Sequence, residues 1–260
     1  MIEMYQLKLV FADNSSVICP EIIMKSSTLF VDMIYFTKCG SDPIQLPFFI
    51  TNTIISDIKN ILEEDDCDYV KTKDCAYIVE IIKTLDFLLI EKMNLSLKTL
   101  VNEKLTVSKS FQVFQNAAGI SCLENLRKKC AEMILKAIEI FYVRDQNSSN
   151  VFDPFIAKYS TMVIQDIQNI IFLCPKSCTR AKILMFNNWW QLNSNIKWKE
   201  ETFQILSTID TDAAYIPRQD IKFMRVLREA FTYTNKLKGL KVAKEYQRFT
   251  EMMFDRLDGQ

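Results

Sequence analysis

The sequence contains no histidine. The Ser-His-Asp and Cys-His arrangements that activate nucleophiles therefore cannot be built from this chain. Zinc sites with mixed cysteine and histidine ligands, and the metalloprotease helix that carries two histidines, are excluded for the same reason. An enzyme would have to use paired carboxylates, lysine or tyrosine, and no spacing in the sequence indicates such a pair. We therefore expect a protein that is not an enzyme and that needs no cofactor.

Glycine and proline are scarce, because the 260 residues include only 4 Gly and 6 Pro. Few tight turns and long uninterrupted elements follow from this composition, which favours helix. An excess of charge of one sign is missing too, since Lys+Arg and Asp+Glu each number 32. Nucleic-acid-binding proteins usually show a basic excess or a basic stripe. We predict a largely helical chain that binds no nucleic acid.

Long apolar runs and a secretory signal are also lacking. No stretch reaches the roughly 18 apolar residues of a membrane span, and the N-terminal MIEM has no basic start or apolar core. The 8 cysteines are scattered. We expect reduced thiols inside the cell, in the cytoplasm or the nucleus, and no membrane association. Cys174 and Cys178 would make half of a thiolate metal site, but no second close pair completes it, so we predict structural cysteines and no metal.

The first third of the chain mixes strands and helices. Alternation over 5–11 predicts a strand, Asp13–Ser16 a turn, and Val17–Cys19 a second strand that completes a hairpin. A helix over 28–35 follows a serine cap. The next elements are a brief extended piece at Ile44–Leu46, a helix at Asn52–Glu63 and a solvated acidic loop at Glu63–Asp68.

The rest of the chain has helical spacing, and the sharpest change in composition lies near residue 105. A linker is expected at Gln146–Asn150. The predicted helices cover 74–89, 93–105, 108–118, 123–142, 153–173, 178–192, 199–208, 218–236 and 240–257. Of the neighbours Trp189 and Trp190, which point to different sides of a helix, we expect one in the core and one partly exposed.

The first 105 residues resemble the BTB/POZ fold, especially its short form in the cullin adaptors of SCF ligases and in elongin C. The resemblance rests on three stretches in the family's order: LKLVFADNSSVICPEIIMKSSTLFVDMI, PIQLPFFITNTIISDIKNILE and VEIIKTLDFLLIEKMNLSLKTLVNEKL. The third would be the closing pair of helices. The resemblance implies an α+β N-terminal BTB/POZ domain over residues 1–106, with a small sheet flanked by helices.

Residues 107–260 resemble the all-α BACK region that follows BTB domains in kelch-type ubiquitin-ligase adaptors. LTVSKSFQVFQNAAGISCLENLRKKCAEMILK is similar to its first two helices, and AKILMFNNWWQLNSNIKWKEETFQILSTIDTDAAYIP to its later part. Residues 143–180 fit the pattern poorly, and no kelch repeats are present. Cys19-Pro20-Glu21 also replaces the family's usual Ala-His-Lys stretch. Because the first strand begins near residue 5, we expect a monomer or a weak homodimer rather than a strand-swapped dimer.

The resemblance implies a non-catalytic adaptor whose partners are a cullin-type scaffold and a client protein. In the family, a cullin docks on the loop after the central helix, on the turn between the closing helices, and on the first helices of the following region. The matching positions here are Phe36, Lys38, Asp42, Asp86, Phe87, Leu88, Phe111 and Phe114. Two alternatives remain for these aromatics: Phe87 in the core, and Phe111 with Phe114 packed between the two domains.

Three functions are compatible with these features. The first is an adaptor that links a cullin-type ubiquitin ligase to a client. The second is a competitor that binds a cullin or a BTB protein and delivers nothing, as a truncated adaptor without a recognition domain would; viruses encode BTB–BACK chains. The third is a BTB scaffold or assembly protein, structural or linked to transcription, with no role in ubiquitin ligation.

Overall fold

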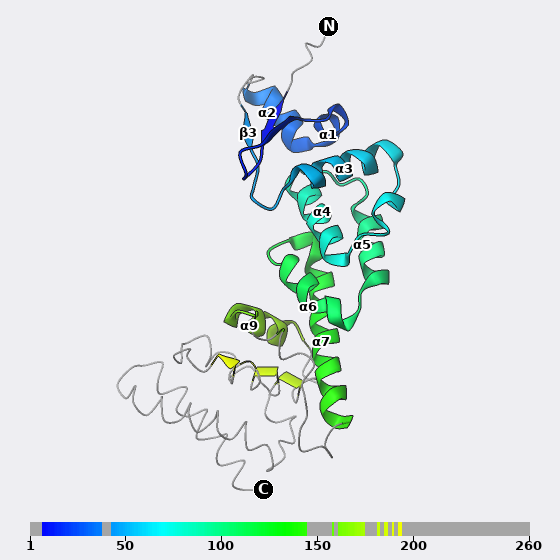
Figure 1. The fold of residues 1–260 in the computed structure, drawn as a ribbon, viewed down its shortest axis with the longest axis vertical. Coiled ribbons are helices and arrows are strands. Elements are labelled where there is room, and N and C mark those ends of the chain that lie inside the picture. The colour runs from blue at the N-terminus through cyan, green and yellow to red at the C-terminus, as the bar shows by residue number, and fades with distance from the viewer. Residues whose placement is uncertain are drawn as a thin grey trace, which may run out of the picture. The chain divides into compact units, whose positions relative to one another are not determined.

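The computed structural model describes residues 7–37, 43–144, 158, 161–174, 181–182, 185–186, 189 and 192–193. By its contacts the chain divides into two compact units, Met1–Arg127 and Lys128–Gln260, and each is described by itself. The first unit is mostly helical with one small sheet (Figure 1). This agrees with the predicted α+β class for the N-terminal part of the chain.

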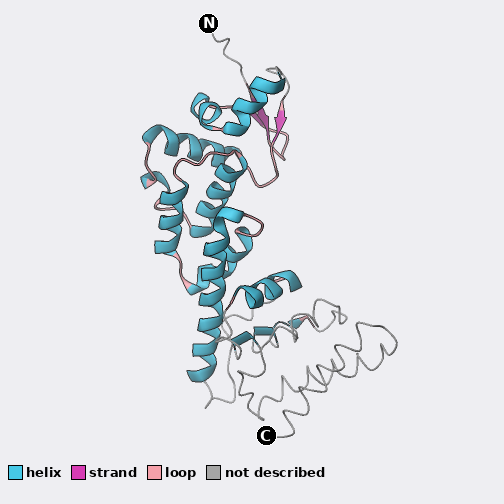
Figure 2. Cartoon of the chain, turned by 180° about the vertical axis from the view of Figure 1, so that it is seen from behind, coloured by secondary structure: helices cyan, strands magenta, loops and turns pink. Residues whose placement is uncertain are grey.

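The sheet has three strands in the order β2-β1-β3. β1 (Lys8–Val10) and β2 (Ser16–Ile18) form the predicted antiparallel hairpin, in which Leu9 lies opposite Val17. The Asp13 carboxylate closes its turn by accepting hydrogen bonds from the amide and the hydroxyl of Ser15. β3 (Ile44–Gln45) then pairs with β1 in parallel. The strands lie near α1 and α2 (Figure 2).

Two helices follow the hairpin. α1 (Glu21–Ser26) begins directly after Pro20, and α2 (Thr28–Thr37) confirms the helix predicted over 28–35. The sequence predicts no helix at α1, because its six residues are too few to show a helical period. α1 packs against α2 and α3, and its Ile23 is fully buried.

The helices that follow α2 lie where the apolar spacing predicts them, within a few residues. α3 packs on α1 and α4, and α4 also packs on α5 and α6. The 3-10 helix η1 (Asp68–Val70) ends the acidic segment, whose carboxylate residues are exposed while Cys67 is buried. The bounds are Asn52–Glu64 for α3, Cys75–Phe87 for α4, Asn94–Lys104 for α5, Val107–Asn116 for α6 and Glu124–Arg144 for α7. A second 3-10 helix, η2 (Ser121–Leu123), leads into α7.

α6 belongs to the first compact unit. It buries Phe111, Val113 and Phe114 and packs against α4. The division by contacts falls at Arg127, inside α7, and the expected boundary at residue 106 stays a prediction.

The described part of the second unit includes α9 (Ile164–Leu173), which buries Ile167, Ile170 and Ile171. The helix predicted over 153–173 is thus interrupted, because residues 161–163 are not helical. The Thr161 hydroxyl donates to the carbonyl oxygen of Lys158, and Asp166 accepts a hydrogen bond from the Val163 amide at the start of α9. Trp189 is fully buried and donates from Nε1 to the Met162 carbonyl oxygen at 2.9 Å. Trp190, the predicted linker and the later helices lie outside the described residues.

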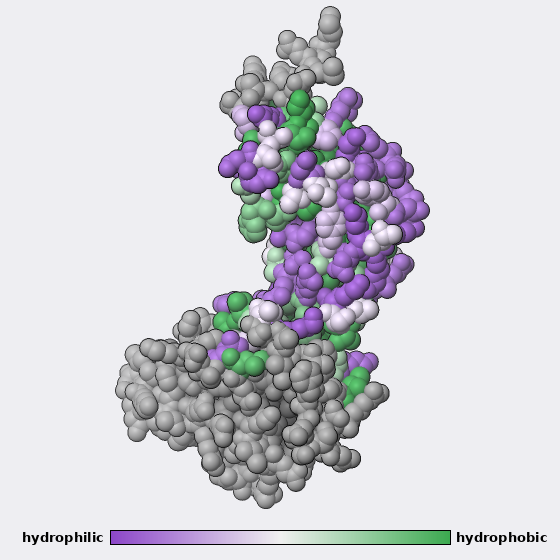
Figure 3. Space-filling model, viewed as in Figure 1, coloured by the Kyte–Doolittle hydropathy of each residue, from purple (hydrophilic) through white to green (hydrophobic). Residues whose placement is uncertain are grey.

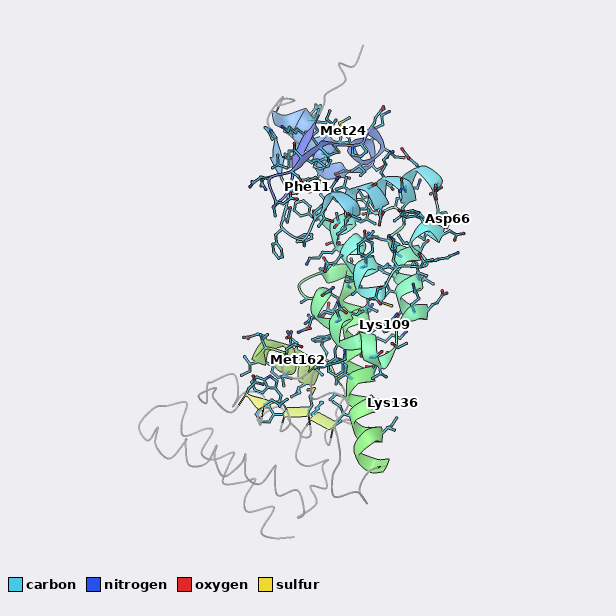
Figure 4. The ribbon with its side chains drawn as sticks, viewed as in Figure 1. Phe11, Met24, Asp66, Lys109, Lys136 and Met162 are labelled. Atoms are coloured by element: carbon cyan, nitrogen blue, oxygen red, sulfur yellow. The ribbon has the colours of Figure 1, made fainter. Side chains whose placement is uncertain are left out.

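Polar and apolar residues are unevenly spread over the first unit. In Figure 3, hydrophilic residues gather over the side formed by α3 and α5. Figure 4 shows Asp66, in the loop after α3, and Lys109, on α6, along this side. The Lys71–Asp68 and Lys92–Asp65 ion pairs lie in the segments that follow α3 and precede α5, and the Lys109–Asp74 pair joins α6 to the residue before α4. This side is therefore mostly a charged, solvated surface.

Candidate protein-binding surface

Three phenylalanines and a lysine from two separate segments form one partly exposed cluster. We call it the aromatic surface, and its members are Phe48, Phe49, Lys83 and Phe87. Phe48 and Phe49 occupy a turn just after β3, closed by a 2.9 Å hydrogen bond from the Ile50 amide to the Pro47 carbonyl oxygen. The Phe48 side chain is 82% exposed, which is unusual for so large an apolar group.

The rings of the aromatic surface meet edge to face. The centroids of Phe48 and Phe49 are 5.9 Å apart, and those of Phe49 and Phe87 are 6.2 Å apart. Edge-to-face pairs at these distances are favourable because the positive ring edge meets the negative ring face. The ammonium of Lys83 lies 4.2 Å from the Phe49 centroid, within cation–π range. The turn after β3 and the helix α4 therefore present one continuous group of rings.

α4 supplies the second half of this cluster through its helical spacing. Glu80, Lys83 and Phe87 are three and four residues apart, so they share one face of the helix. The Lys83 ammonium is 3.8 Å from the Glu80 carboxylate. Partial burial raises the pKa of Glu80, and the nearby Lys83 opposes this by favouring the charged form. The face thus combines an apolar ring with a partly shielded pair of opposite charges.

The end of α4 explains how two helices follow each other without glycine or proline. The Leu89 amide donates to the Asp86 carbonyl oxygen, and the Ile90 amide donates to the Leu85 carbonyl oxygen at 2.8 Å. This is the Schellman arrangement of a helix C-terminus, and it needs one residue in the left-handed region. Leu89 fills that position at φ 53°, with its side chain 52% exposed. The turn holds Phe87 at the rim of the aromatic surface.

The residues predicted to bind a cullin are placed in different environments. Phe36 is 76% exposed at the end of α2, where its ring meets that of Tyr35 edge to face. Lys38 and Asp42 lie outside the described residues. Phe87 is 38% exposed, so its side chain lies partly at the surface and is not buried entirely in the core. Asp86 is half-buried, and its carboxylate accepts a hydrogen bond from the Cys122 thiol, whose pKa is raised by burial first and by Asp86 second.

Leu88, Phe111 and Phe114 are buried inside the first unit. Their side chains therefore belong to the core and present no surface to a partner in this conformation. The spacing of Phe111 and Phe114 identifies one face of α6 correctly, but that face packs against α4. Phe114 also stacks beneath a charged group, since the guanidinium carbon of Arg127 lies 4.6 Å from its ring centroid.

Phe48 and Phe49 are not among the surface residues that the sequence predicts. The available signal was the pair of adjacent aromatic residues after Pro47, in a segment too short for either helical or strand periodicity. Two neighbouring large apolar residues in a turn cannot both point into the core. At least one of them is therefore expected at the surface.

The described residues show no arrangement suited to a metal, since no group of three or more cysteine, aspartate or glutamate side chains comes together among them. Cys174 is described and buried, whereas Cys178 is not described. Among the other described cysteines, Cys19, Cys67, Cys75 and Cys122 are free thiols. Within the described ranges no helix has both the length and the apolar character needed to cross a bilayer.

The sequence matches no protein-family model and no curated protein.

Proposed function

We propose that this protein is a non-catalytic interaction adaptor that binds a cullin-type scaffold through the aromatic surface and brings a client protein to it. The observation that carries the proposal is the partly exposed Phe87, grouped with Phe48 and Phe49 beside the turn between α4 and α5. Interfaces gain most of their binding energy from a few large, rigid side chains of this kind. The site needs neither histidine nor a cofactor.

The order of the elements supports the BTB-like part of the proposal. A hairpin, the two helices α1 and α2, a short third strand, α3 and the pair α4 and α5 follow one another along the chain. The resemblance implies the hairpin, the serine-led helix, the extended piece and the closing helical pair in this order. The free thiols of Cys19, Cys67, Cys75 and Cys122 are compatible with a reducing cytoplasmic or nuclear environment.

The charges of the aromatic surface favour a folded protein as its partner. Lys83 and Glu80 lie within 4 Å of each other on the same helix face as Phe87. Such a charged pair suits the polar rim of an interface, while the three rings suit its apolar centre. We expect the docking element to be a helix that places an apolar side chain between Phe48 and Phe87.

The proposal is tested by affinity purification of the tagged full chain from cell extract. Wild type is compared with Phe87→Ala and Phe48→Ala, and cullins are identified by mass spectrometry. The matched control is Leu95→Ala, because Leu95 on α5 is 79% exposed and lies outside the aromatic surface. Truncation of a central anchor costs about 2 kcal/mol, which corresponds to roughly a 30-fold loss of affinity.

Each result has a definite meaning, provided that circular dichroism shows the variants to be folded. Recovery of a cullin with wild type and Leu95→Ala, and its loss with Phe87→Ala, supports the adaptor. Absence of any cullin from the wild-type sample rejects cullin binding. The alternative is then a BTB scaffold or assembly protein, and the exposed pair Tyr35–Phe36 on α2 is the observation that favours it.

A further inference from the structure

Lys73, in the loop between η1 and α4, lies among two tyrosine rings and a buried carboxylate. Its ammonium is 5.6 Å from the ring centroid of Tyr69 and 5.4 Å from that of Tyr77. It is also 3.8 Å from the carboxylate of Asp57, a side chain that is almost fully buried. We call Tyr69, Tyr77 and Asp57 the ammonium cage.

Three elements of the first unit build the ammonium cage. Asp57 lies on α3, Tyr69 on η1 and Tyr77 on α4, and α3 packs against both of the other elements. The Tyr77 hydroxyl donates a 2.6 Å hydrogen bond to the Asp57 carboxylate, so this ring and this carboxylate are fixed to each other. The walls of the cage are therefore held by packing and hydrogen bonding, and not by the lysine between them.

The distances around Lys73 are long for an unmodified ammonium group. A charge-assisted hydrogen bond to a carboxylate is about 2.8 Å long, so the 3.8 Å separation from Asp57 is too long for one. Both ring distances are close to the outer limit of a cation–π contact, which is about 6 Å. Methyl groups on the nitrogen would lie between it and these three neighbours, as they do in the aromatic cages that bind methyl-lysine. The spacing therefore fits a methylated nitrogen.

Lys104, on α5, shows the opposite arrangement beside the same loop. Its ammonium donates hydrogen bonds to the carbonyl oxygens of Lys71, at 2.6 Å, and of Lys73. Methylation of Lys104 would remove donors that these oxygens use. No hydrogen bond joins the Lys73 ammonium to the residues of the ammonium cage, so methylation of Lys73 removes no such contact.

Methylation would also keep the charge that faces Asp57. The Lys73 side chain is 37% exposed and flexible, so it can turn outward to meet a methyl donor. After the ammonium has released a proton to solvent, the nitrogen lone pair bonds to the methyl carbon of a sulfonium donor. The C–S bond breaks, its electron pair stays on sulfur, and a neutral thioether leaves. The nitrogen again carries one positive charge, whereas acetylation would remove that charge.

We propose that Lys73 is an N-methylation site and that Tyr69, Tyr77 and Asp57 hold its methylated ammonium. The two rings cover the methyl groups, and the buried carboxylate balances the charge. The site shares no residue with the aromatic surface and does not rest on cullin binding.

The first test methylates the lysines of the full folded chain with carbon-13 formaldehyde and a borane reductant, and observes the dimethyl-lysine signals by NMR. The Lys73 signal is assigned by its loss in Lys73→Arg. We expect this signal upfield of those of exposed lysines, because a ring shields methyl groups that lie over its face. Tyr69→Leu should return it to their position, whereas Tyr69→Phe keeps the ring and should not. Tyr35→Leu is the matched control, because Tyr35 on α2 is 77% exposed and lies outside the cage.

The labelling is repeated in Lys104→Arg, which keeps donors for the loop carbonyl oxygens and cannot be methylated by this reaction. An upfield Lys73 signal in both backgrounds supports the proposal. A Lys73 signal at the position of exposed lysines, or an upfield signal that Tyr69→Leu leaves unchanged, overturns it. Mass spectrometry of the chain isolated from the cells that naturally make it is the second test. Methylated Lys73 supports the modification, and exclusively unmodified Lys73 overturns it.

Discussion

The hydroxyl of Ser27 donates a 2.6 Å hydrogen bond to the carbonyl oxygen of Leu88, although the two residues are 61 positions apart in the chain. The same oxygen of Ser27 accepts a hydrogen bond from the Phe30 amide and so caps α2. One fully buried side chain therefore joins the start of α2 to the turn that ends α4. This contact fixes the backbone next to Phe87.

We predict that Ser27→Ala destabilises the protein by about 1 to 3 kcal/mol, because it removes a helix cap and leaves a buried carbonyl oxygen without its donor. The free energy of unfolding, measured by urea denaturation, checks this. Ser26→Ala is the matched control, because Ser26 is only half-buried. A loss as large in Ser26→Ala as in Ser27→Ala would contradict the specific role of Ser27.

A substitution at Leu89 should increase the stability of the protein. At φ 53° it occupies the left-handed region, which costs a residue with a β-carbon roughly 1 to 2 kcal/mol. Leu89→Gly removes this cost, and the added entropy of the unfolded chain offsets part of the gain. We expect an increase in stability of about 0.5 kcal/mol in urea denaturation. Leu95→Gly, at an exposed position inside α5, should instead lower stability by about 1 kcal/mol. Destabilisation by both changes would refute the strain at Leu89.

Asp74 provides a prediction about acid. Its carboxylate accepts a 2.9 Å hydrogen bond from the Ala76 amide at the start of α4, which is the first cause of its lowered pKa, and Lys109 lies 3.3 Å away. Asp74→Ala should cost about 1 kcal/mol at pH 7. Asp74→Asn keeps the cap and loses the charge, so it should retain most of the stability.

The pH dependence of Asp74 follows from the direction of its shift. Because the folded-state pKa lies below the ordinary value of 3.8, the charge contributes stability above that value and loses it as the pH falls further. The stability difference between wild type and Asp74→Asn should therefore shrink below pH 3.8. Thermal unfolding, followed from about one pH unit below this value up to neutral pH, measures the stability difference. A difference that is constant with pH would contradict the effect of the charge.

Tyr77 is linked to a buried acid. Its hydroxyl donates to the Asp57 carboxylate at 2.6 Å, and the Lys73 ammonium lies 3.8 Å from the same oxygen. Tyr77→Phe takes a donor from a carboxylate that is almost fully buried, so we expect a loss of about 1 to 3 kcal/mol at pH 7. Tyr69→Phe is the control, because the Tyr69 side chain is 42% exposed.

Alkaline pH gives a second measurement on the same pair. Burial first, and then the Asp57 carboxylate, raise the pKa of Tyr77 above its ordinary value of 10.0. The wild-type protein should keep this contribution below pH 10.0 and lose it as the pH rises further, because the folded state disfavours the tyrosinate. In Tyr77→Phe the decline above pH 10.0 should be smaller. Equal declines in urea denaturation would show that Tyr77 is not the responsible group.

The helices that the sequence predicts best are those whose apolar period and cap agree. α3 is an example, since Ile54, Ile58 and Ile61 lie on its buried face and the Thr51 hydroxyl accepts a hydrogen bond from the Ile54 amide. Both signals are local, so they can be recognised without knowing the fold. α1 has neither enough length for a period nor a side-chain cap, and for this reason it is not expected from the sequence.

The candidate site is harder to predict, because burial depends on contacts between distant segments. Spacing shows that Phe111 and Phe114 share a helix face, but it does not show that this face packs on α4. In the same way, Phe87 is recognised from its position in α4, while its neighbour Phe49 comes from a turn far away in the sequence.

The position of Phe49 affects how fast a complex would form and separate. Its ring is held by Phe48, Phe87 and the Lys83 ammonium before any partner arrives. An ordered side chain loses little rotational freedom on binding, and such preorganisation lowers the cost of association. Loosening this ring by Lys83→Met should therefore shorten the lifetime of a complex on the aromatic surface more than it slows the encounter.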